Sequence, residues 1–363
     1  MKSKAGKVGK AKVYFARLGE SSTPEQMAAA AERLWEAMKL DGIVSDKALV
    51  AIKQHFGEKG AENYVPGAVA RAIGQRVRKA GGKPFATDSN TLYNGMRANA
   101  VDHLQMAREH GFSHETLGFP VIIADGLKGE SQVTLDGPGE ALKHVFLAGA
   151  GYMADAAIML THVTGHLAAG IGASIKNVAM GLAGRAGKLQ QHHSAEPVFT
   201  ASKCKACGRC AQHCPAGAIV IKDTAVLDRK RCIGCGECYA FCPHGAVGFD
   251  WSTTSVDLQR KMAEYCLAFH KAKAGRAVYL NFMTRVTKNC DCLDKKEPRL
   301  PDMGVAGSFD PVAADAAAID LLNERHGRDV FAEYWPQCAH RTQLEYGEKI
   351  GLGSTRYELV RLD

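Results

Sequence analysis

Eight of the twelve cysteines of this chain lie in two short stretches. The first, CKACGRCAQHCP, runs from Cys204 to Pro215, and the second, CIGCGECYAFCP, runs from Cys232 to Pro243. Each has the spacing C-x2-C-x2-C-x3-C-P, and the copies are offset by 28 residues, so they form an internal repeat. This spacing is typical of iron–sulfur ligation, and in two-cluster ferredoxins the fourth cysteine of each run binds the other cluster.

The repeat therefore predicts two [4Fe–4S] clusters. One cluster is assigned to Cys204, Cys207, Cys210 and Cys242, and the other to Cys232, Cys235, Cys238 and Cys214. Structural zinc is disfavoured because it uses four ligands in two pairs that a loop separates. A disulfide framework does not fit this spacing. It is also typical of secreted proteins, and no secretory signal is predicted in the basic N-terminal stretch.

A further pair of cysteines, in the stretch NCDC, is the candidate for a third metal site. Cys290 and Cys292 are two residues apart, so in an extended segment their side chains face the same side and could bind one ion. His162 and His166 are the candidates for a third ligand, which would leave one coordination position open. The alternatives are two inert thiols or a disulfide, and the disulfide would close an unusually short ring.

Other polar residues follow the predicted strands and are the candidates for catalysis. His55 comes directly after one apolar run, and Asp88 and Asn90 come directly after another. Lys176 and Asn177 follow a glycine-rich stretch that suits a close backbone approach to an anion. Ligand sites of open α/β sheets lie beyond the carboxyl ends of the strands, so we expect these residues to share a cleft. The alternative is structural: turn caps, a satisfied histidine and glycines needed for packing.

The elements that position these residues alternate between strand and helix patterns. Apolar runs at 11–18, 47–56, 83–88 and 119–125 predict strands, and amphipathic stretches at 22–40, 66–82 and 99–112 predict helices. Thr23, Pro24 and Gln26 form a helix-start signature. The sequence therefore predicts a layered α/β domain with a mainly parallel sheet.

The same pattern resumes after the cysteine repeat. Strands are predicted at 276–283 and 302–308, followed by a helix that begins with Asp310 and Pro311. Because so few elements make a poor independent core, we expect residues 1–197 and 253–363 to form one α/β domain. Residues 198–252 are then an inserted bacterial-type two-[4Fe–4S] ferredoxin module of α+β type.

Composition limits the class of protein and of partner. The chain is 46% hydrophobic and 23% charged, without a long apolar run, so we expect a soluble, cytoplasmic protein with no membrane segment. The net charge of +8 suits an acidic redox partner such as a ferredoxin. Nucleic acid is disfavoured because no stripe of basic and aromatic residues is present.

Several long stretches resemble the uncharacterised iron–sulfur-centre proteins known as domain of unknown function 362. They are AIKQHFGE (51–58), GGKPFATDSNTLYNGMRANAVDHL (81–104), PVIIADGLKG (120–129), THVTGHLAAGIGASIKNVAMG (161–181), NCDC (289–292) and YELV (357–360). The resemblance covers nearly the whole chain and implies iron–sulfur binding, but no activity. The family has a pair similar to Cys290 and Cys292, whereas Leu182 stands where many relatives have a cysteine.

These features favour an iron–sulfur oxidoreductase. Its two clusters would exchange electrons with a small-molecule site in the α/β domain, because that domain is larger than an electron carrier requires. The alternative is a ferredoxin-like electron carrier whose α/β domain serves only to dock a redox partner. The sequence names neither the substrate nor the direction of electron flow.

Overall fold

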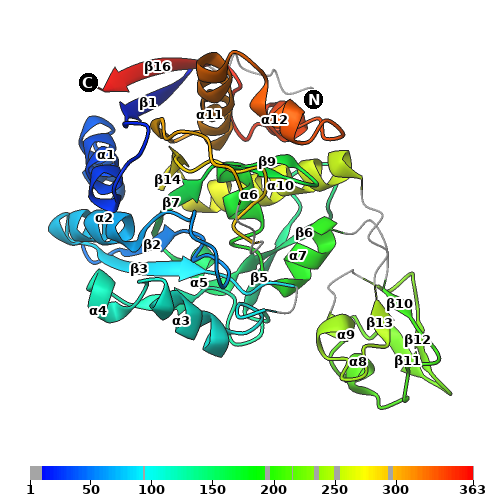
Figure 1. The fold of residues 1–363 in the computed structure, drawn as a ribbon. Helices are drawn as coiled ribbons and strands as arrows, with labels where there is room; N and C mark the ends of the chain where they lie inside the picture. The colour runs from blue at the N-terminus through cyan, green and yellow to red at the C-terminus, as the bar shows by residue number, and fades with distance from the viewer. Residues whose placement is uncertain are drawn as a thin grey trace, which may run out of the picture.

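An eight-stranded sheet forms the centre of the chain (Figure 1). The computed structural model describes residues 10–92, 95–192, 197–214, 216–232, 237–248, 254–292 and 297–362. The strands, in their order across the sheet, are β16 (Tyr357–Leu362), β1 (Ala11–Arg17), β15 (Gly304–Ser308), β14 (Ala277–Met283), β7 (Ala156–His162), β2 (Leu49–Lys53), β3 (Lys83–Asp88) and β4 (Val121–Ile123). Strand β15 is antiparallel to both of its neighbours, and the other pairs are parallel. The predicted α/β class with a mainly parallel sheet is thus confirmed.

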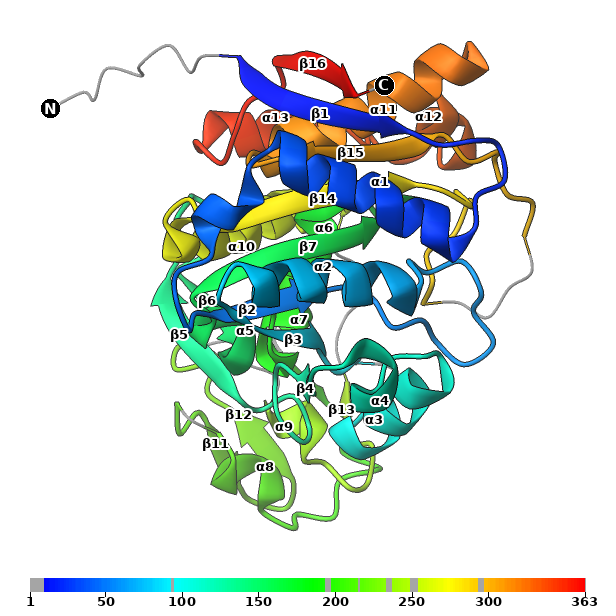
Figure 2. The same ribbon diagram turned by 90° about the vertical axis from the view of Figure 1, so that its left-hand side faces the viewer.

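Helices cover both faces of the sheet. In Figure 2, α1 (Pro24–Ala37) and α2 (Gly67–Lys79) lie in front of the strands, with α3 (Ala100–Glu109) and α4 (His114–Leu117) below them. The opposite face carries α6 (Ser174–Ala179), α10 (Ser255–Lys273) and α11 (Pro311–His326). The remaining helices of this domain are η1 (Leu40–Ile43), α5 (Gly149–Met153), α7 (Arg185–His192), α12 (Val330–Tyr334) and α13 (Thr342–Lys349).

The alternation of side chains along the central strands produces two separate cores. Val50 and Ile52 of β2 pack with the α1 and α2 side, whereas Ala51 between them packs with the α10 and α11 side. Strand β7 divides in the same way, with Ile158 on the first side and Met159 on the second. Because neighbouring residues of a strand point to opposite faces, a sheet covered on both faces needs apolar residues at nearly every position.

Local sequence signals account for the helix boundaries. Thr23 caps α1 through a capping box with Gln26, as its sequence predicts. Asp310 caps α11 by accepting hydrogen bonds from the backbone N–H groups of Val312 and Ala313. Two hairpins, β5 (Gln132–Asp136) with β6 (His144–Ala148) and β8 (Thr164–His166) with β9 (Gly170–Gly172), lie outside the main sheet.

Residues 197–248, called here the cysteine-rich segment, form a separate small lobe (Figures 1 and 2). Its described part contains the two-stranded sheets β10 (Val198–Phe199) with β13 (Val247–Gly248) and β11 (Ile219–Ile221) with β12 (Ala225–Leu227). Each cysteine run contains a short helix, α8 (Arg209–Gln212) in the first run and α9 (Glu237–Ala240) in the second. The main-sheet strands nearest to this segment in the chain, β7 before it and β14 after it, pair with each other.

The length and hydropathy of the helices in the described residues bear on membrane insertion. None of the helices there is both long enough and apolar enough to cross a bilayer.

Candidate functional site

A cavity of about 490 Å³ lies beyond the carboxyl ends of β2, β3 and β7, and we call it the carboxyl-edge cavity. Its charged and hydrogen-bonding lining comes from the ends of these strands and the loops after them, from α6, α7 and α9, and from the loop after β14. This position is the one expected for a ligand site of an open α/β sheet. The polar residues and thiols that line the cavity include Lys53, His55, Asp88, Ser89, Arg97, His162, His166, Lys176, Asn177, Lys188, His192, Tyr239, Cys290, Asp291 and Cys292. Most of the residues that the sequence singles out are therefore brought together here.

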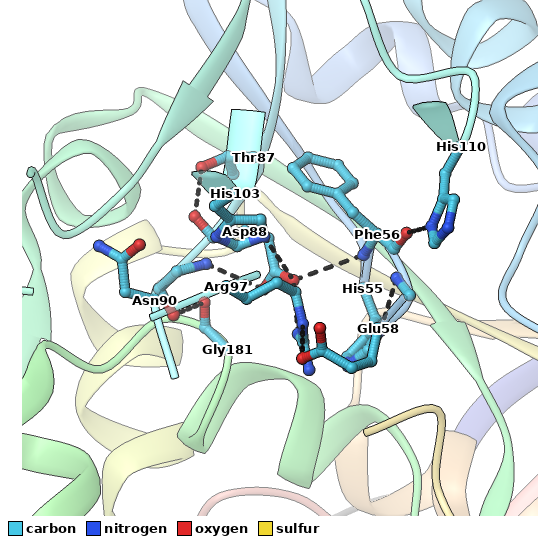
Figure 3. A network of polar contacts seen from close by, with 12 residues as sticks. His55, Phe56, Glu58, Thr87, Asp88, Asn90, Arg97, His103, His110 and Gly181 are labelled. Atoms are coloured by element: carbon cyan, nitrogen blue, oxygen red, sulfur yellow. Dashed lines mark hydrogen bonds and ion pairs between the residues drawn. The ribbon is translucent and has the colours of Figure 1, made fainter. Parts of the chain in front are cut away.

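Asp88, the last residue of β3, is the centre of a buried ionic network (Figure 3). Its carboxylate lies 3.1 Å from Nζ of Lys53 and 3.5 Å from a guanidinium nitrogen of Arg97. Arg97 also pairs with Glu58 at 3.2 Å, and Nε2 of His103 lies 3.8 Å from Asp88. The side chains of Asp88, Lys53 and Arg97 are each at most 3% exposed, so these charges depend on one another for solvation.

Burial and charge act in opposite directions on this network. Burial favours the neutral acid, but Lys53, His55, His103 and Arg97 hold the pKa of Asp88 well below its usual range. Burial lowers the pKa of Lys53, although Asp88 opposes that shift. Burial also lowers the pKa of His103 to about 3, so its imidazole is neutral at physiological pH. Asp88 is therefore an ionised structural anchor.

Two further polar contacts fix the lysines of the cavity. Asn177 accepts a hydrogen bond from Nζ of Lys53 at 2.6 Å and donates one to Thr161. Lys188 donates to Oγ of Ser89 at 2.7 Å and lies 3.5 Å from Asp125. The sequence interpretation missed Lys53, Lys188 and Ser89. Lys53 did carry a signal, because a charged residue ends an otherwise apolar strand there.

Asn90 lies outside the lining of the cavity. Its backbone and side-chain N–H groups donate to Asp125, and its amide also donates to the carbonyl of Gly126. Asn90 thus ties the loop after β3 to the loop after β4, which is a structural role in place of the catalytic one considered above.

His162 ends β7, and both of its ring nitrogens are already hydrogen bonded. Nδ1 lies 2.8 Å from the carboxylate of Asp291, and Nε2 lies 2.7 Å from the carbonyl of Thr284. Although burial opposes it, Asp291 raises the pKa of His162, and His162 in turn holds the pKa of Asp291 low. Because both neighbours are acceptors, both nitrogens act as donors. This geometry does not suit His162 as the third metal ligand that the sequence suggested.

Cys290 and Cys292 line the cavity, and His55 is the histidine that contacts Cys292. Nδ1 of His55 accepts a hydrogen bond from the backbone N–H of Gly57 at 2.9 Å, so Nε2 carries the proton. That Nε2 lies 3.4 Å from Sγ of Cys292. The thiol of Cys290 and then His55 hold the pKa of Cys292 well below its usual range against the effect of burial, whereas the same pairing raises the pKa of Cys290. The two side chains are hydrogen bonded to each other, and Cys292 is the more acidic of the pair.

His166, the other proposed ligand, is also oriented by the backbone. Its Nδ1 accepts hydrogen bonds from the N–H groups of Ala168 and Ala169 at 3.3 and 3.1 Å. Burial and then Lys176 lower the pKa of His166 well below its usual value, so the ring is neutral. A neutral ring with an accepting Nδ1 presents an N–H at Nε2 and lacks the lone pair that a metal needs there.

These arrangements disfavour the third metal site. Among the residues whose placement is described, no group of three or more His, Cys, Asp or Glu side chains is arranged to hold a metal ion. Near Cys290 and Cys292, the three histidines His55, His162 and His166 all present N–H groups or have both nitrogens occupied. We therefore do not carry this hypothesis forward.

The glycine-rich stretch before α6 also differs from its expected role. The first N–H groups of α6, at Ser174 and Ile175, donate to the carboxylate of Asp315 at 2.7 and 2.9 Å. Burial raises the pKa of Asp315 to about 6, and these hydrogen bonds partly offset that effect. A side chain of α11 thus occupies the anion position at this helix start, while Lys176 and Asn177 reach the cavity.

The cysteine-rich segment brings most of its cysteines into one cluster with Ile219, Ala225 and Val247. Cys204, Cys207, Cys210 and Cys242 line a single small cavity, although Cys242 belongs to the second run. Backbone N–H groups donate to sulfur at Cys204, Cys214 and Cys242, at 3.2 to 3.4 Å. Cys214, Cys232 and Cys238 of the other set lie among the described residues, and Cys235 lies outside them.

One residue of the cysteine-rich segment reaches the carboxyl-edge cavity. Tyr239 lies in α9, directly after Cys238, and it lines this cavity together with His192 at the end of α7. Phe241, two residues further on, lines a second pocket with Asn99 and Arg185 of the α/β domain. The side of the segment formed by α9 and the residue after it therefore lies next to the α/β domain.

The sequence of the chain matches one described family. A family described as a domain of unknown function (DUF362) matches residues 50–320, which include both the cavity loops and the cysteine-rich segment. The chain belongs to this family. The resemblance to DUF362 proteins drawn from the sequence is thus confirmed. Membership assigns no activity, and no curated protein matches the chain.

Two solved structures are similar to the chain. A protein from Thermotoga maritima matches with a TM-score of 0.41 and 10% identity, over 91% of this chain and 60% of its own. The lactate racemase apoprotein from Thermoanaerobacterium thermosaccharolyticum matches with a TM-score of 0.41 and 12% identity, over 86% of this chain and 57% of its own. This chain thus spans less than two thirds of the length of either.

Proposed function

We propose that this DUF362 protein is an iron–sulfur oxidoreductase. Two [4Fe–4S] clusters in the cysteine-rich segment would exchange electrons with a small molecule in the carboxyl-edge cavity. The observation that carries the proposal is Tyr239, which lies next to the predicted cluster ligand Cys238 and lines the cavity. A segment that only carried electrons to other proteins would have no reason to contribute to this cavity.

The cysteine geometry supports the cluster assignment. Cys242 lies with Cys204, Cys207 and Cys210 around one cavity, as cross-ligation between the two runs requires. The backbone N–H groups directed at three of the sulfurs are the donors that stabilise thiolates and tune cluster potential. Each cluster would supply one-electron chemistry, and the cavity residues would bind the substrate and exclude water.

The segment has an exposed basic region and a part that lies next to the cavity, which suits electron transfer between a partner protein and the cavity. Cys207 is exposed, and the exposed basic residues Lys203, Lys205 and Arg209 flank it in the sequence. Cys238 is buried, and its neighbour Tyr239 lines the cavity. The segment contains seven Lys and Arg residues against three Asp and Glu, so an acidic redox protein is the partner that fits its exposed side.

The test of the proposal uses protein whose clusters have been reduced without oxygen. We expect a small-molecule fraction of a cell extract to reoxidise the reduced protein, with the change followed by its visible absorbance. The Lys176→Met variant should react more slowly with that fraction, because Lys176 lines the cavity. Reoxidation by the protein fraction alone would favour the alternative of a ferredoxin-like carrier.

Shortening Tyr239 should slow electron exchange between the clusters and the cavity. We expect Tyr239→Ala to lower the rate of reoxidation roughly tenfold or more. Without the ring that lines the cavity a bound substrate can shift, and its misplacement by about 1 Å can cost about a hundredfold in rate. The matched control is Tyr239→Phe, which keeps the ring and should react at nearly the wild-type rate. Equal rates for Tyr239→Ala and the wild type, at unchanged cluster content, would contradict this role.

Reversing charge beside Cys207 should weaken the reaction with an acidic ferredoxin. The Lys203→Glu/Lys205→Glu variant should accept electrons more slowly at low salt, by roughly one order of magnitude, and the difference should shrink as salt screens the charges. The control is Lys79→Glu/Lys83→Glu, the same charge change at exposed positions. These lysines lie near the amino end of β3, away from the end that borders the cavity. A similar loss of rate in both variants would show that overall charge, and not this surface, governs the encounter.

A further inference from the structure

We infer that the carboxyl-edge cavity binds a small organic anion, a carboxylate or phosphate, whose oxygens accept hydrogen bonds from Lys176 and His166. As an assignment of substrate class, this inference rests on the proposed function. It depends on donors of two residues that line the cavity, Nζ of Lys176 and Nε2 of His166.

The first donor is the ammonium of Lys176. The other cations of the cavity have carboxylate partners: Lys53 and Arg97 lie on Asp88, and Lys188 lies near Asp125. Lys176, by contrast, makes no hydrogen bond or ion pair with any residue in the described part of the chain. A lysine at such a site presents a compact point charge with three donors to a ligand.

The second donor follows from the tautomer of His166. Two backbone N–H groups, from Ala168 and Ala169, are directed at Nδ1, so that nitrogen holds a lone pair. The ring is neutral, because burial and Lys176 lower its pKa. The single ring proton therefore lies on Nε2, which has no partner among the described residues and can donate to a ligand.

The recognition is directional and does not depend on net charge alone. Cys292, whose pKa Cys290 and then His55 hold low, lines the same cavity as Lys176 and His166. It offsets part of the positive potential, so an anion gains most from oxygens placed on the two N–H donors. The rest of the lining includes Leu92, Leu160, Leu167 and Met180, and these suit an apolar body attached to the anionic group.

Cys292 also provides a reporter for the site. Iodoacetate and iodoacetamide both alkylate a thiolate: sulfur bonds to the CH2 carbon, and iodide leaves with the electron pair of the C–I bond. The main difference is that iodoacetate carries a carboxylate, whereas iodoacetamide carries a neutral amide. We expect the ratio of the two alkylation rates at Cys292 to favour iodoacetate about tenfold more in the wild type than in Lys176→Met, because charge-assisted hydrogen bonds are the strong ones.

The ratio separates recognition from reactivity. Lys176→Met also changes the thiolate character of Cys292, but that change affects both reagents alike and cancels in the ratio. His166→Leu should lower the ratio as well, and His166→Gln should partly restore it by supplying an N–H donor. The control is Lys143→Met, an exposed lysine outside the cavity. An unchanged ratio in Lys176→Met overturns the inference.

Competition then identifies the anion. Propanoate and methyl phosphate are added as protecting ligands at millimolar concentrations, with neutral propanamide as the matched control. Stronger protection of Cys292 by propanoate assigns a carboxylate, and stronger protection by methyl phosphate assigns a phosphate. Equal protection by propanamide, or none by either anion, overturns the inference. The measurement uses the resting, oxidised protein, so protection by an anion stands even if reduced clusters transfer no electrons, an outcome that would reject only the proposed oxidoreductase.

Discussion

Replacement of Cys242 with serine is expected to remove about four of about eight irons from protein purified without oxygen. The loss should fall on the cluster assigned to Cys204, Cys207 and Cys210, although Cys242 lies far from them in the sequence. The reason is geometric, since Cys242 lines one cavity with those three residues and accepts a hydrogen bond from the N–H of Ala246. Iron and sulfide analysis together with electron paramagnetic resonance of the reduced protein measures the result.

The complementary variant tests the other cluster. Cys214→Ser should damage the cluster assigned to Cys232, Cys235 and Cys238 and leave the first largely intact. Cys338→Ser is the matched control, because this buried thiol lies outside the cysteine-rich segment and should keep the full iron content. If the serine at Cys242 spares the Cys204 set, each run binds its own cluster. Zinc without sulfide in the wild type would reject iron–sulfur binding altogether.

The strands and helices could be predicted where a local signal existed. The capping residues of α1 and α11 and the short apolar run of β2 each carry such a signal within a few residues. Strand β7 was not predicted, although it lies at the centre of the sheet. Its run AAIMLTH is buried at every position, and a fully buried run has no periodicity that separates a strand from a helix.

The site could be predicted only at the level of which loops meet. His55, Asp88 and His162 follow parallel strands, and topology alone brings them to one edge of the sheet. Their partners could not be predicted, because they come from distant segments. Asp291, which pairs with His162, is 129 residues away in the chain, and Lys53 and Asp88 come from different strands. Ring tautomers likewise depend on backbone N–H groups that only the folded loops position.

A second large effect is expected at Asp88, where asparagine should destabilise the protein by about 3–5 kcal/mol, because removing one partner leaves buried charges uncompensated. Among the described residues, Lys53 would keep its hydrogen bond to Asn177, and Arg97 would keep its ion pair with Glu58. The midpoint of urea unfolding, followed by circular dichroism, measures the change. The matched control is Asp46→Asn, whose carboxylate lies 4.0 Å from Lys47 on an exposed surface and should matter by less than about 0.5 kcal/mol.

The pH dependence and a double variant together identify the cause of this effect. The neighbouring cations depress the pKa of Asp88 in the folded state, so its stabilising contribution is present above its unfolded pKa of about 3.9 and is lost as pH falls through the folded value. Unfolding of the wild type should therefore depend more steeply on pH below about 4 than that of Asp88→Asn. Adding Lys53→Met to Asp88→Asn removes one of the stranded cations and should recover part of the lost stability. If the two substitutions are simply additive, the pair is uncoupled. Asp88 then stabilises the fold through the hydrogen bonds that its carboxylate accepts from the backbone N–H groups of Phe56 and Ser89.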